Sequence, residues 1–159
     1  MRPIESKIIS LEKIPALADS IRKQGRRIVT TNGCFDILHW GHIKYLSEAR
    51  NLGDLLIVGL NSDTSVRDLK GPSRPIYDEG LRLRQLAGLE SVDYVVLFEE
   101  RTPEKFLAAV KPAIHVKGGD YDPAQLPERG GVEAGGGKVI VLPFVPGLST
   151  TGLIERLRR

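Results

Sequence analysis

Five short apolar runs, separated by amphipathic segments, constrain the fold of this chain more than any other feature of its sequence. The runs are RIVTT, LLIVGL, YVVLF, AIHV and KVIVLPF. Each has the length of a strand that is buried on both faces, and such strands belong to parallel sheets covered by helices. The pattern predicts an α/β fold, namely a Rossmann-like, doubly wound, five-stranded parallel sheet in a single domain.

Helix signals occupy the segments between these runs. Residues 11–21 carry apolar side chains at helical spacing, after Ser10 as a possible N-cap and before Gly25 as a stop. We expect residues 1–26 to form a helical extension that packs on the main domain, formed by residues 27–159.

Three later segments also suit helices. HIKYLSEARNLG predicts a helix that ends at Gly53, and Thr102 and Pro103 suit the cap and first position of another. The final segment, STTGLIERLRR, begins with hydroxyl residues that can cap a helix. The glycine-rich residues 118–137 are expected to form a pair of loops around a short helix.

Composition narrows the class of protein. The 159 residues are 41% hydrophobic and 27% charged, which fits one globular domain with a core. The net charge of +3 is spread over short basic clusters and aromatic residues make up 6%, unlike the basic stripes of nucleic-acid binders. A small anionic ligand is the better use of scattered lysines and arginines.

No sequence feature indicates export or a membrane. The only cysteine, Cys34, excludes an intramolecular disulfide, and no apolar stretch has the length of a membrane span. The first residues lack the pattern of a signal peptide. We therefore expect a cytoplasmic protein with small-molecule partners, no nucleic acid and no membrane.

Polar or glycine-containing segments follow four of the five predicted strands, at residues 32–42, 61–63, 117–121 and 144–151. Ligands of open parallel sheets bind beyond the carboxyl ends of the strands. These segments are therefore expected to converge on one site.

His39 and His42 lie in the first of these segments, and three roles compete for them. A zinc site would need further ligands, and neither Cys34 nor His115 stands at a recognisable ligand spacing. An acid–base pair would serve a nucleophile, and no elbow-type serine or cysteine motif is present.

A phosphate site fits the position of the two histidines best. A glycine loop that runs from a strand into a helix offers unpaired N–H groups and the positive end of the helix dipole. Gly33 and Gly41 would let the backbone approach an anion, while imidazole N–H groups and Lys44 would donate to its oxygens.

Two sequence signatures resemble a known superfamily. GCFDILHWGH matches the pattern G-x-F-D-x-x-H-x-G-H, and Ser149-Thr150-Thr151 match a second signature at the start of the last helix. Both occur in the expected order at opposite ends of the chain. On these residues the chain resembles the HxGH nucleotidyltransferases, which include the cytidylyltransferases.

Further stretches resemble one branch of that superfamily, the D-glycero-β-D-manno-heptose 1-phosphate adenylyltransferases. They include VGLNSDTSVRDLKGPSRPI, VKGGDYDP and GGGKVIVLPFVPGLSTTGLIERL. The resemblance implies transfer of AMP from ATP to the heptose 1-phosphate by direct in-line attack on the α-phosphorus, giving ADP-heptose and pyrophosphate for a surface glycan such as lipopolysaccharide. Mg²⁺ would be carried mainly by the nucleotide phosphates.

The resemblance also bears on partners. In many bacteria this activity is fused behind a sugar kinase, whereas this chain resembles the stand-alone form with a separate kinase upstream. Apolar helix faces would allow a homodimer.

Two alternatives stay open. One is a cytidylyltransferase acting with CTP on glycerol 3-phosphate or a related sugar or polyol phosphate. The glycerol-3-phosphate enzymes are similar in HWGHIK, but their R-T-E-G-I-S-T-T signature has an arginine that FVPGLSTT lacks. A non-catalytic nucleotide-binding module would use the same pocket.

By resemblance, each candidate site residue receives a role. The catalytic residues are His39, His42 and Lys44; the nucleotide-binding residues are Asn32, Gly33, Cys34, Phe35, Gly41, Gly118, Gly119, Asp120, Ser149, Thr150 and Thr151; the substrate or pyrophosphate side takes Lys70, Arg74, Arg82 and Lys117.

Asp36, Trp40, His115 and the side chain of Cys34 are interpreted from position. Asp36 either orients its loop or touches ligand, and Trp40 is either a lid or a packing aromatic. His115 is expected to pack within its strand, and Cys34 to fill a tight loop.

Overall fold

The five predicted strands form one parallel sheet in the computed structural model, which describes all of residues 1–159. They are β1 (Ile28–Gly33), β2 (Leu55–Asn61), β3 (Tyr94–Phe98), β4 (Ile114–Gly118) and β5 (Lys138–Leu142), in the spatial order β3-β2-β1-β4-β5. The prediction of a Rossmann-like five-stranded parallel sheet is confirmed.

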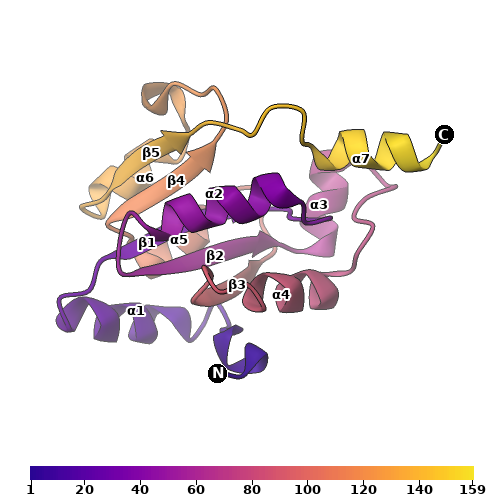
Figure 1. The fold of residues 1–159 in the computed structure, drawn as a ribbon. Coiled ribbons are helices and arrows are strands. Elements are labelled where there is room, and N and C mark those ends of the chain that lie inside the picture. The colour runs from indigo at the N-terminus through magenta and orange to yellow at the C-terminus, as the bar shows by residue number, and fades with distance from the viewer.

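Helices cover both faces of this sheet (Figure 1). One face carries α2 (Trp40–Arg50) and α4 (Glu79–Ala87), and the other carries α1 (Ile14–Lys23), α5 (Glu104–Val110) and α6 (Arg129–Ala134). Helices α3 (Asp63–Lys70) and α7 (Thr150–Leu157) follow the carboxyl ends of β2 and β5, and two short 3₁₀ helices span Ile4–Lys7 and Pro123–Gln125.

Each face has its own apolar core. The first gathers Leu46 and Ala49 of α2 with strand residues such as Val58 and Val116, and the second packs α1 and α5 against the opposite side of the same strands. Gly59 of β2 permits the close packing of α5 on the sheet, because a Cβ there would lie 2.8 Å from the ring of Phe106. Helices on both sides explain why the strand runs are mostly apolar and do not alternate with polar residues.

The order of the strands creates a crevice between β1 and β4. The chain leaves β1 toward β2 and β3 on one side, and β4 and β5 lie on the other, so the strand order reverses direction at β1–β4. Whereas β1 pairs with β2 along its whole length, it pairs with β4 only at Val29–Ile114 and Thr30–His115. The two strands therefore part before their carboxyl ends, where ligands of such folds bind.

The helix boundaries correct three details of the sequence prediction. Helix α1 begins at Ile14, and the Ser10 hydroxyl accepts from the Lys13 N–H in the turn before it. Helix α5 has Pro103 as its N-cap and no side-chain cap, so Thr102 does not cap it. Helix α2 ends at Arg50, before Gly53. The segment 118–137, expected to hold one short helix, holds two, the 3₁₀ helix Pro123–Gln125 and α6.

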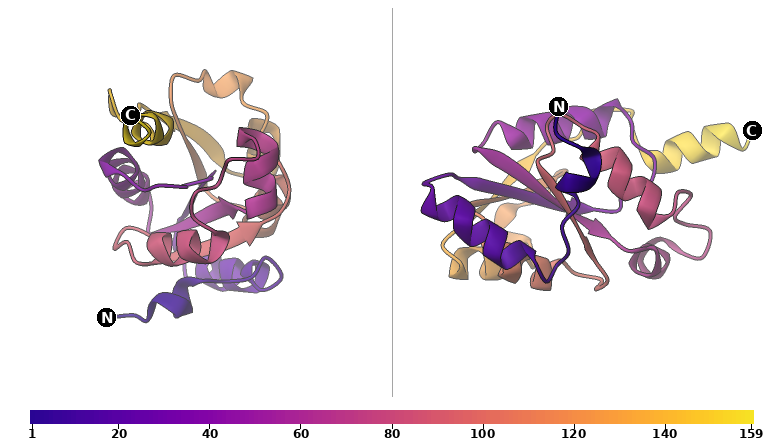
Figure 2. Two further views of the ribbon diagram at one scale, coloured as in Figure 1. Left: turned by 90° about the vertical axis from the view of Figure 1, so that its right-hand side faces the viewer. Right: turned by 90° about the horizontal axis from the view of Figure 1, so that it is seen from below.

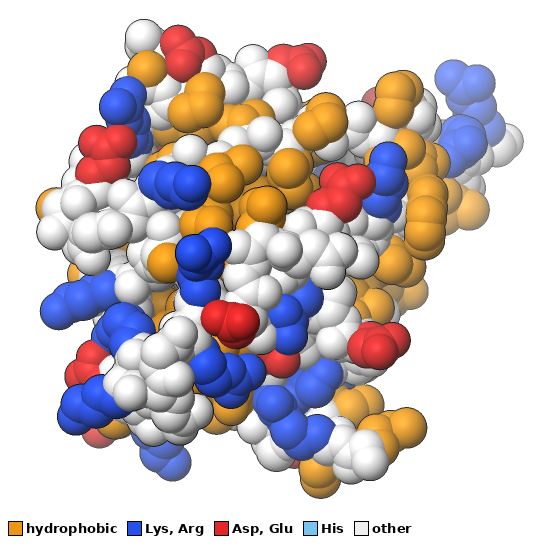
Figure 3. Space-filling view, turned by 60° about the vertical axis from the view of Figure 1, so that its left-hand side comes forward, with side chains coloured by type: hydrophobic (Ala, Val, Ile, Leu, Met, Phe, Trp, Pro, Cys, Tyr) orange, Lys and Arg blue, Asp and Glu red, His pale blue; other side chains and the backbone are white.

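Helix α7 extends beyond the carboxyl ends of the strands and away from the body of the sheet (Figures 1 and 2). None of its residues is fully buried. On the opposite side of the molecule, blue and red charged side chains are interspersed with apolar ones, and no histidine is visible (Figure 3). None of the helices combines the length and the apolar character needed to cross a membrane.

Candidate active site

A cavity of about 670 Å³ lies beyond the carboxyl ends of the strands. It is lined by residues at or beyond the carboxyl ends of all five strands, including Asn32 in β1, Asn61 at the end of β2, Arg101 after β3, Lys117 in β4 and Ser149 after β5. The segments after four strands were expected to meet at one site, and they do. The segment after β3 lies at the same site.

His39 and His42 cap the first turn of α2 with one nitrogen each. Nδ1 of His39 accepts from the Gly41 N–H at 3.1 Å, and Nδ1 of His42 accepts from the His39 N–H at 3.4 Å. The two rings stack with centroids 3.9 Å apart. Because Nδ1 of each neutral ring accepts, its proton is assigned to Nε2. Both residues also line the cavity, so each ring can cap the helix and still offer a donor to a ligand.

Both imidazoles are neutral near pH 7. Burial, reinforced by the neighbouring His39, lowers the pKa of His42 to about 4, and burial also lowers the pKa of His39 from its usual 6.5. A neutral imidazole can donate its Nε2–H to an oxygen of a phosphate. Neither ring is charged when such a ligand arrives.

The loop before α2 depends on two backbone features. Phe35 adopts a left-handed conformation with φ of 44°, and its ring packs into the core 5.4 Å from the His42 ring. A Cβ on Gly41 would lie 2.9 Å from the His39 ring, so glycine permits the capping geometry there. The Tyr45 hydroxyl donates to the Val116 carbonyl at 3.0 Å and hydrogen-bonds Thr31 Oγ1 at 2.6 Å, which fastens α2 over β1 and β4.

The two sequence signatures, at residues 33–42 and 149–151, meet at this loop. Ser149 caps α7 by accepting from the Gly152 N–H at 3.0 Å, as predicted. Thr150 Oγ1 donates to the Ile37 carbonyl at 3.2 Å, just before the histidines. Ser149, Thr150 and Thr151 line the same cavity as His39 and His42. The amino end of α7 and that of α2 therefore open onto one space, and both can attract an anion.

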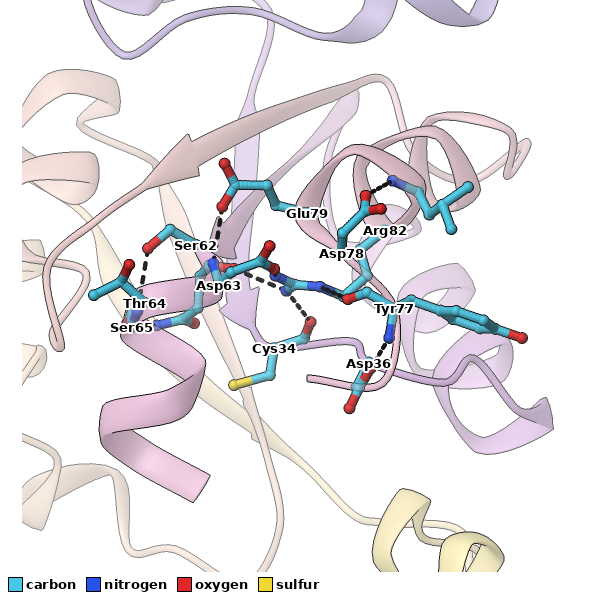
Figure 4. A network of polar contacts seen from close by, with 12 residues as sticks. Cys34, Asp36, Ser62, Asp63, Thr64, Ser65, Tyr77, Asp78, Glu79 and Arg82 are labelled. Carbon is cyan, nitrogen blue, oxygen red and sulfur yellow. Dashed lines mark hydrogen bonds and ion pairs between the residues drawn. The ribbon is translucent and has the colours of Figure 1, made fainter. Parts of the chain in front are cut away.

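Arg82 belongs to the framework beside this space, which corrects its expected place among the substrate contacts. Its side chain is fully buried and does not line the cavity. The guanidinium donates to the carbonyls of Cys34, Asn61 and Tyr77 at 2.8–2.9 Å and to Asp63 Oδ1 at 2.7 Å (Figure 4). Four of its five donors are thus used within the protein, which leaves little for a ligand.

Asp36 orients a loop and does not face ligand with a free oxygen. Its buried carboxylate accepts from Arg74 Nε at 2.7 Å and from the backbone N–H groups of Ile76 and Tyr77 at 2.8–3.0 Å. Although burial opposes ionisation, these hydrogen bonds and Arg74 lower the pKa of Asp36. The carboxylate therefore stays charged and pins residues 74–77 beside the first loop.

The cavity brings together most of the predicted site residues. Those that line it are Asn32, Gly33, Cys34, Phe35, His39, Gly41, His42, Lys44, Lys70, Arg74, Lys117, Gly118, Ser149, Thr150 and Thr151. Besides Arg82, two predicted site residues do not line the cavity. Gly119 turns the chain with φ of 126°, and Asp120 beyond it is exposed to solvent.

The structure also shows the surroundings of His115, Trp40 and Cys34. His115 is fully buried and hydrogen-bonds Thr30 Oγ1 through Nδ1 at 2.8 Å, so it packs in its strand as expected. Trp40 is 61% exposed and lies outside the cavity. Cys34 is half-buried in the loop, and burial raises the pKa of its thiol.

The sequence analysis missed several cavity residues, among them Arg101, Tyr45 and Glu128. Arg101 follows β3 by three residues, so the rule that selected the other strand ends would also have selected it. Tyr45 and Glu128 carry no such signal, because they reach the cavity from the middle of α2 and the start of α6.

A family model described as cytidylyltransferase-like matches residues 30–156, the part of the chain that builds this cavity. The chain belongs to the cytidylyltransferase-like family. The predicted resemblance to the HxGH nucleotidyltransferases is thereby confirmed at the level of the family.

Curated relatives and solved structures agree with this assignment. The chain is 53% identical to the bifunctional protein HldE of Trichlorobacter lovleyi over 98% of its own length and 32% of that protein, and 53% identical to HldE of Pelobacter propionicus over 96% and 31%. It spans about a third of the length of these relatives.

Among solved structures, the lipopolysaccharide core biosynthesis protein of Thermoplasma volcanium is 35% identical with a TM-score of 0.64, over 76% of this chain and 98% of that one. Pantoate-beta-alanine ligase of Francisella tularensis is 17% identical with a TM-score of 0.55, over 96% and 79%, and shares the fold.

Proposed function

We propose that this chain is an adenylyltransferase that transfers AMP from ATP to D-glycero-D-manno-heptose 1-phosphate and releases pyrophosphate. The observation that carries the proposal is that the stacked rings of His39 and His42 and the residues at the amino end of α7 line one cavity, joined by the Thr150–Ile37 hydrogen bond. Support for the sugar comes from the resemblance to heptose 1-phosphate adenylyltransferases and from the HldE relatives.

The chemistry requires little from the protein beyond binding and alignment. The second pKa of a phosphate monoester is about 6, so the attacking oxygen is already ionised near neutral pH and no general base is needed. The remaining barrier comes from aligning the nucleophile with the α-phosphorus and from the charge that moves onto pyrophosphate. In this role His39 and His42 donate through Nε2–H to oxygens of the reacting phosphates, where a preorganised donor is most effective.

The amino ends of α2 and α7 supply backbone donors on either side of the triphosphate. Ser149 uses its hydroxyl oxygen for the α7 cap, so its hydroxyl hydrogen is free for a phosphate oxygen. Lys44 lines the cavity one turn into α2, with a loose 3.7 Å pair to Glu48 that a phosphate can replace. The substrate-side cations would be Lys70, Arg74 and Lys117, to which the cavity adds Arg101.

The carboxylates that line the cavity fit a Mg²⁺ ion that arrives on the nucleotide. Asp36, Glu48 and Glu128 are each paired with a cation, and no group of three or more histidine, cysteine or acidic side chains is arranged to hold a metal. Mg²⁺ keeps several waters and commonly binds through substrate phosphates. When bound, it would neutralise charge on the β- and γ-phosphates.

A matrix of nucleotides and sugar phosphates tests the proposal. Pyrophosphate release is measured with ATP or CTP against heptose 1-phosphate (both anomers) or glycerol 3-phosphate, with Mg²⁺. The proposal expects ATP with heptose 1-phosphate to give the highest kcat/KM. Preference for CTP with glycerol 3-phosphate would establish the cytidylyltransferase alternative, and nucleotide binding with no pyrophosphate from any pair would establish a non-catalytic module.

A further inference from the structure

Lys117 and Glu128 form an ion pair at the crevice where β1 and β4 part. Lys117 Nζ lies 3.3 Å from Glu128 Oε1 and 3.5 Å from Asn32 Oδ1 of β1. The side chains of Lys117 and Glu128 are 20% and 12% exposed, and all three residues line the cavity. A charged pair is thus held at the point in the fold where a ligand is expected.

Glu128 has an acceptor that the protein does not use. Its Oε2 is buried with no donor within hydrogen-bond distance, although Oε1 faces Lys117. A buried carboxylate oxygen without a donor is costly. By contrast, Asp36 in the same cavity has a donor for each oxygen. Glu128 is therefore suited to accept a hydrogen bond from a ligand.

The pair lies on the other side of the sheet from the two histidines. A Cβ on Gly118 would lie 3.3 Å from the ring of Tyr45 on α2, the helix of the histidines. Because side chains alternate along a strand, the preceding residue, Lys117, points to the opposite face, where it meets Glu128 at the start of α6. The cavity thus has a phosphate-binding side at α2 and α7 and a separate polar side at α6.

The polar side matches a polyhydroxyl group. Glu128 offers an acceptor, the Lys117 ammonium offers donors, and the Asn32 amide offers both. Adjacent sugar hydroxyls donate and accept at once, so they can satisfy this set where a simple anion or cation cannot. Resting on the function proposed above, we propose that Glu128, Lys117 and Asn32 bind the ring hydroxyls of the acceptor sugar phosphate and select a sugar over a shorter polyol phosphate.

Substitution of Glu128 by glutamine tests this subsite, because the amide keeps the shape and loses the charge. Steady-state pyrophosphate release with Mg²⁺-ATP is measured for Glu128→Gln against heptose 1-phosphate and glycerol 3-phosphate. We expect KM for heptose 1-phosphate to rise about tenfold, the effect of a charge-assisted hydrogen bond. KM for ATP should stay within about twofold, and the preference for heptose 1-phosphate over glycerol 3-phosphate should shrink by the same factor of about ten.

Glu133→Gln is the matched control. Glu133 lies on the same helix, pairs with Arg129 at 2.7 Å, is about half exposed and does not line the cavity. It should leave both KM values and the sugar preference unchanged. Glu128→Asp keeps the charge one methylene further back and should fall between the wild type and Glu128→Gln. Thermal melts of each variant separate a loss of folding from a loss of binding.

Two results would overturn the subsite. One is an unchanged sugar preference in a folded Glu128→Gln protein, and the other is a rise confined to KM for ATP, which would assign the carboxylate to the ribose. Should the wild type release no pyrophosphate, the proposed function fails, and calorimetric titration of heptose 1-phosphate in the presence of a non-hydrolysable ATP analogue decides the subsite. Tenfold weaker binding to Glu128→Gln would support it, and equal binding or no binding to the wild type would refute it.

Discussion

Replacing Arg82 by methionine should cost about 3–5 kcal/mol of unfolding free energy, the range for removing one partner of a buried ion pair. The methionine fills a similar volume but leaves three carbonyls and Asp63 Oδ1 without the donors that now lie 2.7–2.9 Å away. Because domains of this kind are stabilised by about 5–15 kcal/mol in total, a large part of the stability is at stake.

Urea denaturation followed by circular dichroism measures this loss, provided that the slope of free energy against urea is unchanged. Arg84→Met is the control, since Arg84 is exposed on the same helix and donates only to the Gly80 carbonyl at 3.2 Å; it should change stability by less than about 0.5 kcal/mol. Asp63→Asn keeps an acceptor oxygen and should cost less than Arg82→Met. A loss below about 1 kcal/mol for Arg82→Met, within the effect of one ordinary hydrogen bond, would refute the view that this guanidinium joins the loops around the cavity.

The remaining predictions concern the histidines and α7. His42→Ala, and likewise His39→Ala, should lower kcat by roughly 10²–10³ because a preorganised donor is lost, whereas kcat within threefold of wild type in a folded protein would contradict this role. Burial lowers the pKa of His115 to about 3 in the folded protein, whereas the same imidazole has a pKa near 6.5 in the unfolded chain. Because protonation then favours the unfolded state, the free energy of unfolding falls as the pH drops below 6.5. Denaturation at pH 7 and pH 5 should therefore show a loss of about 2 kcal/mol from this residue, which His115→Asn should abolish; an unchanged pH dependence in that variant would count against the assignment. Thr150→Val should raise KM for ATP about threefold to tenfold in steady-state assays, the effect of one neutral hydrogen bond, while Thr150→Ser should not; equal KM values for the two variants would argue against the link to Ile37.

The sheet could be predicted from the sequence because strands that are buried on both faces give short, mostly apolar runs of residues. Each of the five runs is mostly apolar, without the polar alternation of a half-exposed strand, and each became a strand. Helix starts were less predictable. At α1, Pro15 suits the first turn and the helix begins later than Ser10 suggests, and at α5 the Thr102 hydroxyl makes no cap. Local patterns therefore indicate that a helix is present better than they indicate where it begins.

The cavity side chains divide in a similar way. Residues that directly follow a strand could be predicted, because the carboxyl ends of parallel strands meet at one edge. Arg82 could not, since its burial depends on carbonyls from Cys34, Asn61 and Tyr77, which only the folded chain brings together. An arginine in a helix pattern reads as a surface charge until those partners are known. Glu128 was missed because its pairing with Lys117 crosses from α6 to β4.

Helix α7 has a consequence for how a nucleotide would be held. It buries none of its residues fully, yet it presents Ser149 and Thr150 to the cavity. Its docking against the rest of the chain therefore contributes little free energy, and an anion that bridges α7 and α2 would supply much of what keeps the helix in place. Cleavage by a protease near Arg156 and Arg158 should then slow markedly when ATP is added, so that occupancy of the cavity could be followed at the last turn of the chain without any measurement of turnover.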